Sequence, residues 1–127
     1  MINFREFFRA YVEAALWSSC DDNEGYLDES IGVFEGNISL SCYLSMARDC
    51  KQFLDYAKDE LNQLDYTCNE YTTSDLAGHD FWLTKEGHGA GFWDRGLGEL
   101  GDKLTINAQS FSSSYLYIDD GGMLQIG

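Results

Sequence analysis

The chain has 127 residues, enough for one domain with a modest hydrophobic core, and its 44% hydrophobic and 15% aromatic content is globular rather than disordered. Its 22 acidic and 8 basic residues give a net charge of −14, which argues against direct binding to nucleic acid or to an anionic membrane. No apolar run approaches the length of a membrane span, and MINFREFF lacks the pattern of a signal peptide. We therefore expect a single cytoplasmic domain over residues 1–127.

Two helices are predicted in the N-terminal half. Residues 2–19 repeat apolar side chains at helical spacing, and Asn3 precedes Glu6 by three residues, as in an N-terminal capping box. Residues 38–65 carry a longer apolar stripe with charged residues outside it, which predicts a long amphipathic helix.

Two acidic regions are candidate contacts for a basic partner. The loop over residues 19–37 has six acidic residues and no base, and the long helix offers a second acidic face. The candidate contacts are Asp21, Asp22, Glu24, Asp28 and Glu29 in the loop, and Asp49, Asp55, Asp59 and Glu60 on the helix. For each carboxylate, solubility alone is the competing explanation.

The hydrophobic period changes in the C-terminal half. HDFWLT and AGFWD flank the glycine-rich KEGHG, which predicts a β-hairpin. Residues 97–110 suit a third helix, and SYLYIDDGGMLQIG predicts a second hairpin about an Asp-Gly turn. The order of elements indicates an α+β fold: two N-terminal helices, then β-hairpin, helix and β-hairpin. We expect an antiparallel sheet of about four strands packed on the helices.

The cysteines give no sign of a metal or redox site. Cys20, Cys42, Cys50 and Cys68 show none of the spacings of zinc fingers or thioredoxin-like proteins. We expect reduced thiols, with Cys42 and Cys50 two turns apart on the buried face of the long helix.

Residues 78–94, GHDFWLTKEGHGAGFWD, contain both histidines and two of the three tryptophans of the chain. Two histidines with Asp80 and Asp94 nearby lack the usual spacing of zinc ligands, and neither His79 nor His88 accompanies a recognisable nucleophile motif. The interpretation that explains most residues is a tight aromatic hairpin, with no metal, cofactor or catalytic residue. The hairpin residues, which also form the alternative ligand site, are His79, Asp80, Trp82, His88, Gly89, Gly91, Trp93, Asp94 and Arg95.

The segment AGHDFWLTKEGHGAGFWDRG resembles a signature of small acidic proteins encoded by bacteriophages and other mobile elements, whose usual form is AGHDFWLTRNGHGAGFWDRG. The ALWSSCDD segment at 15–22 and, more loosely, YIDDG at 117–121 are also similar to that family. Lys85 and Glu86 replace the usual Arg-Asn pair, so no role can be assigned to a base at position 85 on this ground. The resemblance implies a genomic context and the cytoplasm of a bacterial host, and it assigns no catalytic residue.

These observations favour a non-enzymatic inhibitor of a host defence complex, of the anti-CRISPR or antirestriction type. Its carboxylates would mimic nucleic-acid phosphates at the basic cleft of a host protein or ribonucleoprotein complex. One alternative is a small enzyme or ligand-binding domain in which His79, Asp80, His88 and Arg95 converge in a concave pocket with perturbed pKa values. The other is a structural phage protein whose charge only keeps it soluble.

The oligomeric state is open between monomer and homodimer. Trp17, Tyr66 and Tyr71 could form an apolar face, which suits a second copy of the chain as well as a different partner.

Overall fold

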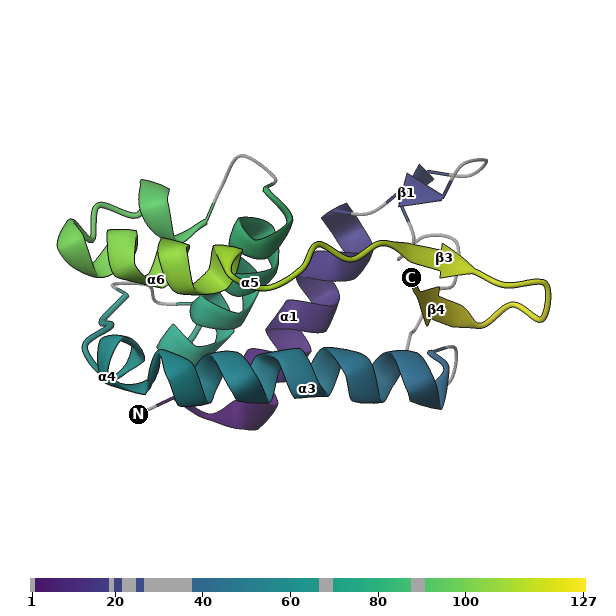
Figure 1. Cartoon of the computed structure of the whole chain (residues 1–127), viewed down its shortest axis with the longest axis horizontal. Coiled ribbons are helices and arrows are strands. Elements are labelled where there is room, and N and C mark those ends of the chain that lie inside the picture. The colour runs from purple at the N-terminus through teal and green to yellow at the C-terminus, as the bar shows by residue number, and fades with distance from the viewer. Residues whose placement is uncertain (1, 19, 22–24, 27–37, 67–69, 88–90) are drawn as a thin grey trace.

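The structure is a computed structural model that describes residues 2–18, 20–21, 25–26, 38–66, 70–87 and 91–127. Its elements in chain order are α1 (Phe4–Ser18), β1 (Cys20–Asp21), β2 (Gly25–Tyr26), α3 (Leu40–Tyr56), α4 (Lys58–Leu61), α5 (Thr73–Glu86), the 3-10 helix η1 (Phe92–Asp94), α6 (Glu99–Gln109), β3 (Leu116–Ile118) and β4 (Leu124–Ile126). Helix α3 runs along the long axis of the molecule, and the β3–β4 hairpin lies at the end opposite α4 (Figure 1).

The predicted α+β fold with a four-stranded sheet is wrong, because the described part of the chain is mostly helical. Its strands form two separate antiparallel pairs, β1 with β2 and β3 with β4. The hairpin about the Asp-Gly turn is confirmed, with Leu116 opposite Ile126. The N-terminal helix and the helix predicted at 97–110 are confirmed as α1 and α6. The long second helix is divided into α3 and α4 at Ala57, whose φ of −103° and ψ of 20° interrupt it.

The predicted hairpin around residues 78–94 is also wrong. HDFWLT belongs to helix α5, and FWD forms the 3-10 helix η1. Thr72 and Asp75 make a capping box at the start of α5, and Gly87 ends the helix in the left-handed conformation with φ 71°. The helix is buried on most sides, so its apolar residues run together without the period of a surface helix, and such a run is easily taken for a strand.

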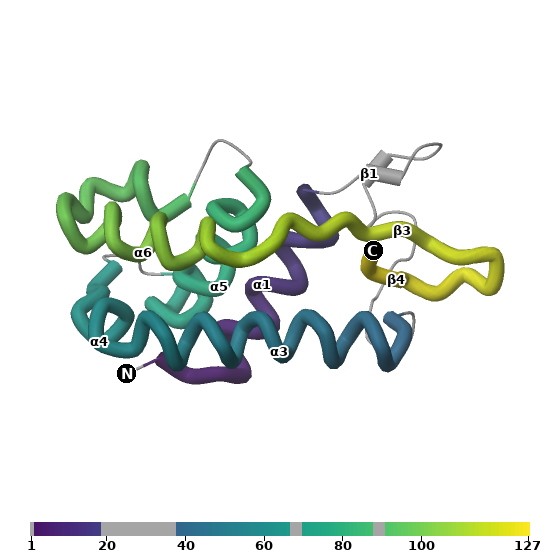
Figure 2. Tube along the Cα trace, viewed as in Figure 1, coloured from purple at the N-terminus to yellow at the C-terminus, as the bar shows by residue number. Residues whose placement is uncertain are grey.

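Helix α5 lies at the centre of the fold and packs closely on α1. A Cβ atom at Gly78 would lie 2.0 Å from the carbonyl oxygen of Phe7, so only glycine allows this approach of the two backbones. Phe81 of α5 stacks on Phe53 of α3, with ring centroids 4.0 Å apart and an angle of 7° between the rings. Figure 2 shows α1 crossing α3, with α5 beside α1 and α6.

The hairpin and the cysteines complete the core. The amide of Ser39 donates to the carbonyl of Leu124, which fixes β4 at the first turn of α3. Cys42 and Cys50 are buried free thiols, as the sequence predicted, and burial raises the pKa of Cys42 to about 11.

None of the helices in the described residues has the length and apolar character needed to span a bilayer.

Candidate functional site

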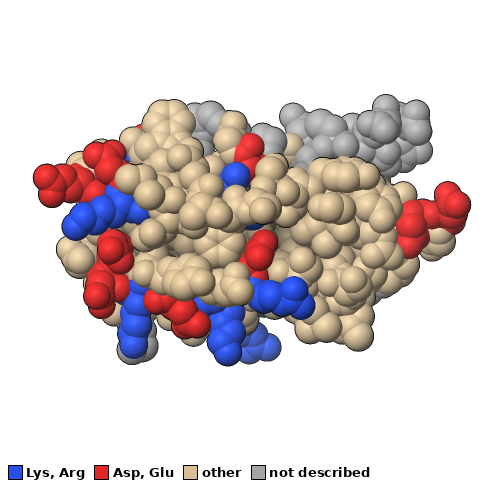
Figure 3. Space-filling model, in the orientation of Figure 1, with Lys and Arg blue, Asp and Glu red and all other residues tan. Residues whose placement is uncertain are grey.

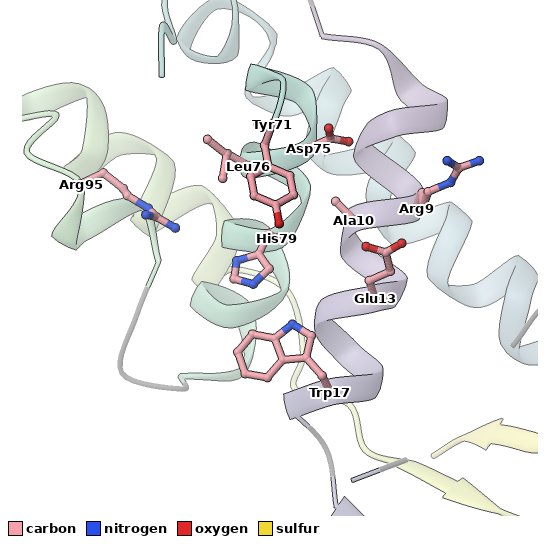
Figure 4. A pocket seen from close by; sticks show the side chains of 9 residues that line it. All are labelled: Arg9, Ala10, Glu13, Trp17, Tyr71, Asp75, Leu76, His79 and Arg95. Carbon is pink, nitrogen blue, oxygen red and sulfur yellow. The ribbon is translucent and has the colours of Figure 1, made fainter. Parts of the chain in front are cut away.

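A surface pocket of about 570 Å³ opens between α1 and α5 (Figure 4). Its walls combine aromatic rings with charged groups of both signs. The lining residues are Arg9, Ala10, Glu13, Trp17, Tyr71, Asp75, Leu76, His79 and Arg95.

Helical spacing explains how the pocket residues come together. Glu13 and Trp17 are four residues apart on α1, and Asp75 and His79 are four residues apart on α5, so each pair shares one helix face. The close approach of the two helices at Gly78 sets these faces side by side. The walls of the pocket therefore depend on the most tightly packed helix pair of the fold.

An ion pair joins Arg95, which lines the pocket, to the buried Asp80. Arg95 donates from Nε and Nη2 to the two carboxylate oxygens of Asp80, at 3.0 and 2.8 Å, and the Tyr66 hydroxyl donates to Oδ2 at 2.8 Å. The Asp80 side chain is fully buried, whereas that of Arg95 is 36% exposed. Asp80 therefore positions the guanidinium group of Arg95 at the pocket.

The pKa of Asp80 reflects two opposing effects. Burial acts to raise the pKa, because it disfavours the ionised carboxylate. The combined effect of His79, Arg95 and Tyr66 is larger, so the pKa lies below its ordinary value. Asp80 is thus a stable anion, unsuited to accept a proton near neutral pH.

His79 is held by stacking rather than by hydrogen bonds. Its ring lies against Trp17, with centroids 5.4 Å apart and an angle of 26° between the rings. Its Nδ1 atom lies 3.8 Å from Asp80 Oδ1, too far for a hydrogen bond, and no other described group bonds to this buried atom. The side chain is 30% exposed, so the imidazole presents part of its surface to the pocket.

Contacts between α5 and η1 explain the roles of other residues in the predicted motif. Thr84 Oγ1 accepts from the Phe92 amide at 3.1 Å, and the Asp94 carboxylate accepts from the Gly91 amide at 3.0 Å. Gly91 has φ 152°, and a Cβ atom there would lie 2.0 Å from Thr84 Oγ1. Gly91 and Asp94 thus shape the turn that brings Arg95 back to Asp80.

The two tryptophans of the motif have different environments. Trp82 is buried and donates from Nε1 to the Ser18 hydroxyl at 2.8 Å, so it belongs to the core. Trp93 is 52% exposed on η1. His88 and Gly89 lie outside the described residues.

Of the residues predicted to converge, His79 and Arg95 line the pocket and Asp80 lies directly behind them. Sequence reasoning missed the carboxylates Glu13 and Asp75. It singled out Trp17 and Tyr71 only as an apolar face, although the spacing of Glu13 and Trp17 could have indicated their shared position. Among the described residues, no group of three or more His, Cys, Asp or Glu side chains is placed to hold a metal ion.

A second buried ion pair lies at the end of α5. The Lys85 ammonium contacts the Glu86 carboxylate, donates to the Ser114 hydroxyl at 3.2 Å and lies 4.7 Å from the centroid of the Trp82 ring. Glu86 in turn accepts from the Ser114 amide at 3.1 and 3.0 Å. This pair fastens the chain that leads into β3 to the end of α5.

The acidic candidates on the long helix differ in exposure. Asp55 and Asp59 are exposed, Glu60 is half-buried, and Asp49 is half-buried with a pKa that burial raises. Asp21 belongs to β1, while Asp22, Glu24, Asp28 and Glu29 lie outside the described residues. Figure 3 shows acidic side chains next to basic ones, and not a surface of one sign, on the visible face around α4 and α6.

Further acidic residues lie where α6 packs against η1 and α4. Asp94 and the first turn of α6 contribute exposed carboxylates that sequence reasoning did not connect with α4. Lys58 and Lys103 are exposed in the same region, and the charge of the neighbouring Arg95 is paired with Asp80. We call this region the acidic end and define it by Asp59, Asp94, Glu99 and Asp102.

Comparisons with protein-family models, with curated proteins and with solved structures found no match. The similarity to phage and mobile-element proteins therefore stays a prediction.

Proposed function

We propose that this chain is a bacteriophage or mobile-element protein that inhibits a host defence complex by stoichiometric binding, without catalysis. The target is a host protein or ribonucleoprotein complex with a basic surface for nucleic acid, as in CRISPR or restriction systems. The resemblance of residues 77–96 supports the genomic context, and the net charge of −14 supports the basic partner.

The observation that carries the proposal is the acidic end. Asp59, Asp94, Glu99 and Asp102 are all exposed on neighbouring elements and outnumber the exposed Lys58 and Lys103, and the charge of Arg95 is paired with Asp80. Carboxylates in this arrangement can replace phosphates at a basic cleft. Association driven by such charges is fast and weakens as salt rises.

The test is capture of a partner from the lysate of a bacterial host by the tagged chain at low and high salt, read by mass spectrometry. We expect one nucleic-acid-handling complex that is released at high salt and whose activity the chain inhibits. Recovery of no such complex at either salt concentration would contradict the proposal.

Charge reversal locates the contact. Glu99→Lys combined with Asp102→Lys should reduce capture at least tenfold, because two attractive contacts become repulsive. The matched control combines Glu70→Lys with Asp120→Lys, two exposed carboxylates outside the acidic end, for the same change in net charge. Equal losses in both variants would mean that only the overall charge matters.

A ligand-binding domain is the second candidate, because His79 and Arg95 line one pocket in front of the buried Asp80. Under this candidate, His79→Ala abolishes function while the chain remains folded. Under the inhibitor proposal, the same substitution leaves partner capture intact unless stability falls.

A further inference from the structure

We propose that the pocket between α1 and α5 binds the guanidinium group of an arginine side chain of a protein partner, at the aromatic rings and carboxylates that line it. This inference rests on the proposed function, since it takes the partner to present a basic surface. It adds a specific contact at a site formed by α1 and α5, with different residues from the acidic end.

Two exposed aromatic rings provide the surfaces on which a guanidinium stacks. Trp17 is 43% exposed and Tyr71 is 56% exposed, so both rings present surface to a ligand. His79 lies against one face of Trp17 and holds the indole at the pocket. Figure 4 shows the His79 ring between Tyr71 and Trp17, and aromatic rings that are exposed in this way attract cations.

Two carboxylates provide the charge that pairs with the ligand. Glu13 lies one turn before Trp17 on α1, and Asp75 lies one turn before His79 on α5. Each wall of the pocket therefore carries one ring and one carboxylate. Aromatic faces combined with carboxylates favour a cation, and the planar guanidinium matches this set better than a compact ammonium group.

The basic residues of the pocket do not make it an anion site. Arg95 uses two of its donors on Asp80, so its charge is balanced within the wall. The Arg9 side chain is directed away from His79 and Trp17 (Figure 4). With Asp80 included, three carboxylates stand against two guanidinium groups. The remaining charge of the pocket is negative.

The experiment is an NMR titration of the full chain with the blocked tripeptide acetyl-Gly-Arg-Gly-amide. The matched probe replaces arginine with citrulline, which has the same shape without the charge. We expect the arginine peptide to shift the Trp17 indole N–H and the His79 ring signals with a Kd on the order of 1 mM. The citrulline peptide should bind at least tenfold more weakly.

Variants assign the binding to the pocket. Glu13→Gln should weaken the arginine peptide about fivefold, because it removes one partly solvated ion pair. Asp120→Asn is the control and should change nothing, since Asp120 is exposed between β3 and β4, outside both the pocket and the acidic end. Trp17→Ala should abolish the shifts, and Trp17→Phe should retain part of the affinity because a benzene ring binds cations less strongly than indole. Circular dichroism shows whether each variant keeps its helices.

Several results would overturn the inference. Equal binding of the citrulline peptide would show that charge is not recognised, and stronger binding of a lysine tripeptide would assign the pocket to ammonium groups. Tighter binding of acetyl-Gly-Glu-Gly-amide at the same residues would identify an anion site. Failure of the peptide titration with successful partner capture would refute this inference alone. Peptide binding without a captured complex would refute only the proposed function.

Discussion

Two carboxylates of helix α5, Asp80 and Glu86, form ion pairs whose surroundings differ. Near the middle of the helix, Asp80 pairs with Arg95, whose side chain keeps 36% of its surface exposed at the pocket. At the end of the helix, the side chains of Lys85 and Glu86 are only 0% and 5% exposed. The two carboxylates are stable in the interior because each accepts hydrogen bonds from several donors.

Arg95 is a charge that is held at the surface, whereas the charges of Lys85 and Glu86 serve only to stabilise the fold. Arg95 is fixed by Asp80 yet remains in contact with solvent and with any molecule in the pocket. Ser113 and Ser114 form hydrogen bonds with the charged groups of Lys85 and Glu86. This pair therefore attaches the segment before β3 to the end of α5. Replacing one partner in each pair measures this difference.

We expect Glu86→Gln to have the largest effect on stability, lowering the free energy of unfolding by about 3–5 kcal/mol. The substitution leaves the Lys85 ammonium, whose side chain is 0% exposed, without the carboxylate that it contacts. Urea denaturation followed by circular dichroism measures the change. Adding Lys85→Met should restore much of the loss by removing the unpaired charge. If the double variant is as unstable as Glu86→Gln, an unpaired charge is not the cause.

Asp80→Asn should cost less, about 2–3 kcal/mol, because the exposed Arg95 side chain can turn to water once its partner is lost. The pKa of Asp80 is lowered in the folded chain, so ionised Asp80 contributes stability at pH values above the ordinary carboxyl value of about 3.9. That contribution is lost as the pH falls through the folded-state pKa.

The pH dependence provides the control for this prediction. Denaturation between about pH 2 and pH 5 should show a steeper loss of stability in the parent chain than in Asp80→Asn, because only the parent takes up a proton at this site on unfolding. Identical slopes in the two proteins would show that the pKa of Asp80 is not lowered by folding.

Sequence patterns located the surface elements of this fold better than its centre. Helix α1 has one buried and one exposed face, so its hydrophobic period was sufficient to predict it. The β3–β4 hairpin has a strong turn signal, which was sufficient to predict the hairpin. The prediction of helix α5 failed because neighbouring elements bury most of its sides, which removes the amphipathic period from its sequence. The capping box at Thr72 and Asp75 was the local signal that could have corrected the prediction.

The candidate site was likewise predicted only in part from the sequence. The alternative ligand-site hypothesis placed His79, Asp80, His88 and Arg95 together. His79 and Asp80 of α5 do lie near Arg95, which follows η1, and His88 lies outside the described residues. The partners from α1, Glu13 and Trp17, could not be assigned to that group because they lie more than 60 residues away in the chain. Only the packing of α1 on α5 at Gly78 brings the two sets together.

Tyr66→Phe should have a smaller effect than either ion-pair variant. It removes one hydrogen bond to Asp80 and should lower the free energy of unfolding by about 1 kcal/mol. The same loss should raise the pKa of Asp80, because one donor that stabilises the carboxylate is gone. An NMR pH titration of the Asp80 carboxyl carbon measures this shift. An unchanged pKa would show that the Tyr66 hydroxyl does not stabilise the ionised carboxylate.

Asp49→Asn should have the smallest effect and the opposite sign, a gain of about 0.5 kcal/mol at neutral pH. Burial raises the pKa of Asp49, and Lys85 and Arg48 offset this only in part. The folded chain therefore favours the protonated carboxyl, so the ionised form costs stability as the pH rises through the folded-state pKa. The gain should vanish below the ordinary carboxyl pKa of about 3.9, where the side chain is protonated in both states.

Asp55→Asn on the same helix is the control, because Asp55 is exposed and the substitution should leave stability nearly unchanged. A loss of stability in Asp49→Asn would show that the Asp49 charge supports Lys85 in the folded chain. The end of α5 would then hold a network of three charges in place of one closed pair. In that case the single variant Glu86→Gln should also cost less than 3 kcal/mol, since Lys85 would retain an anionic neighbour. The smallest prediction therefore decides how the largest one is interpreted.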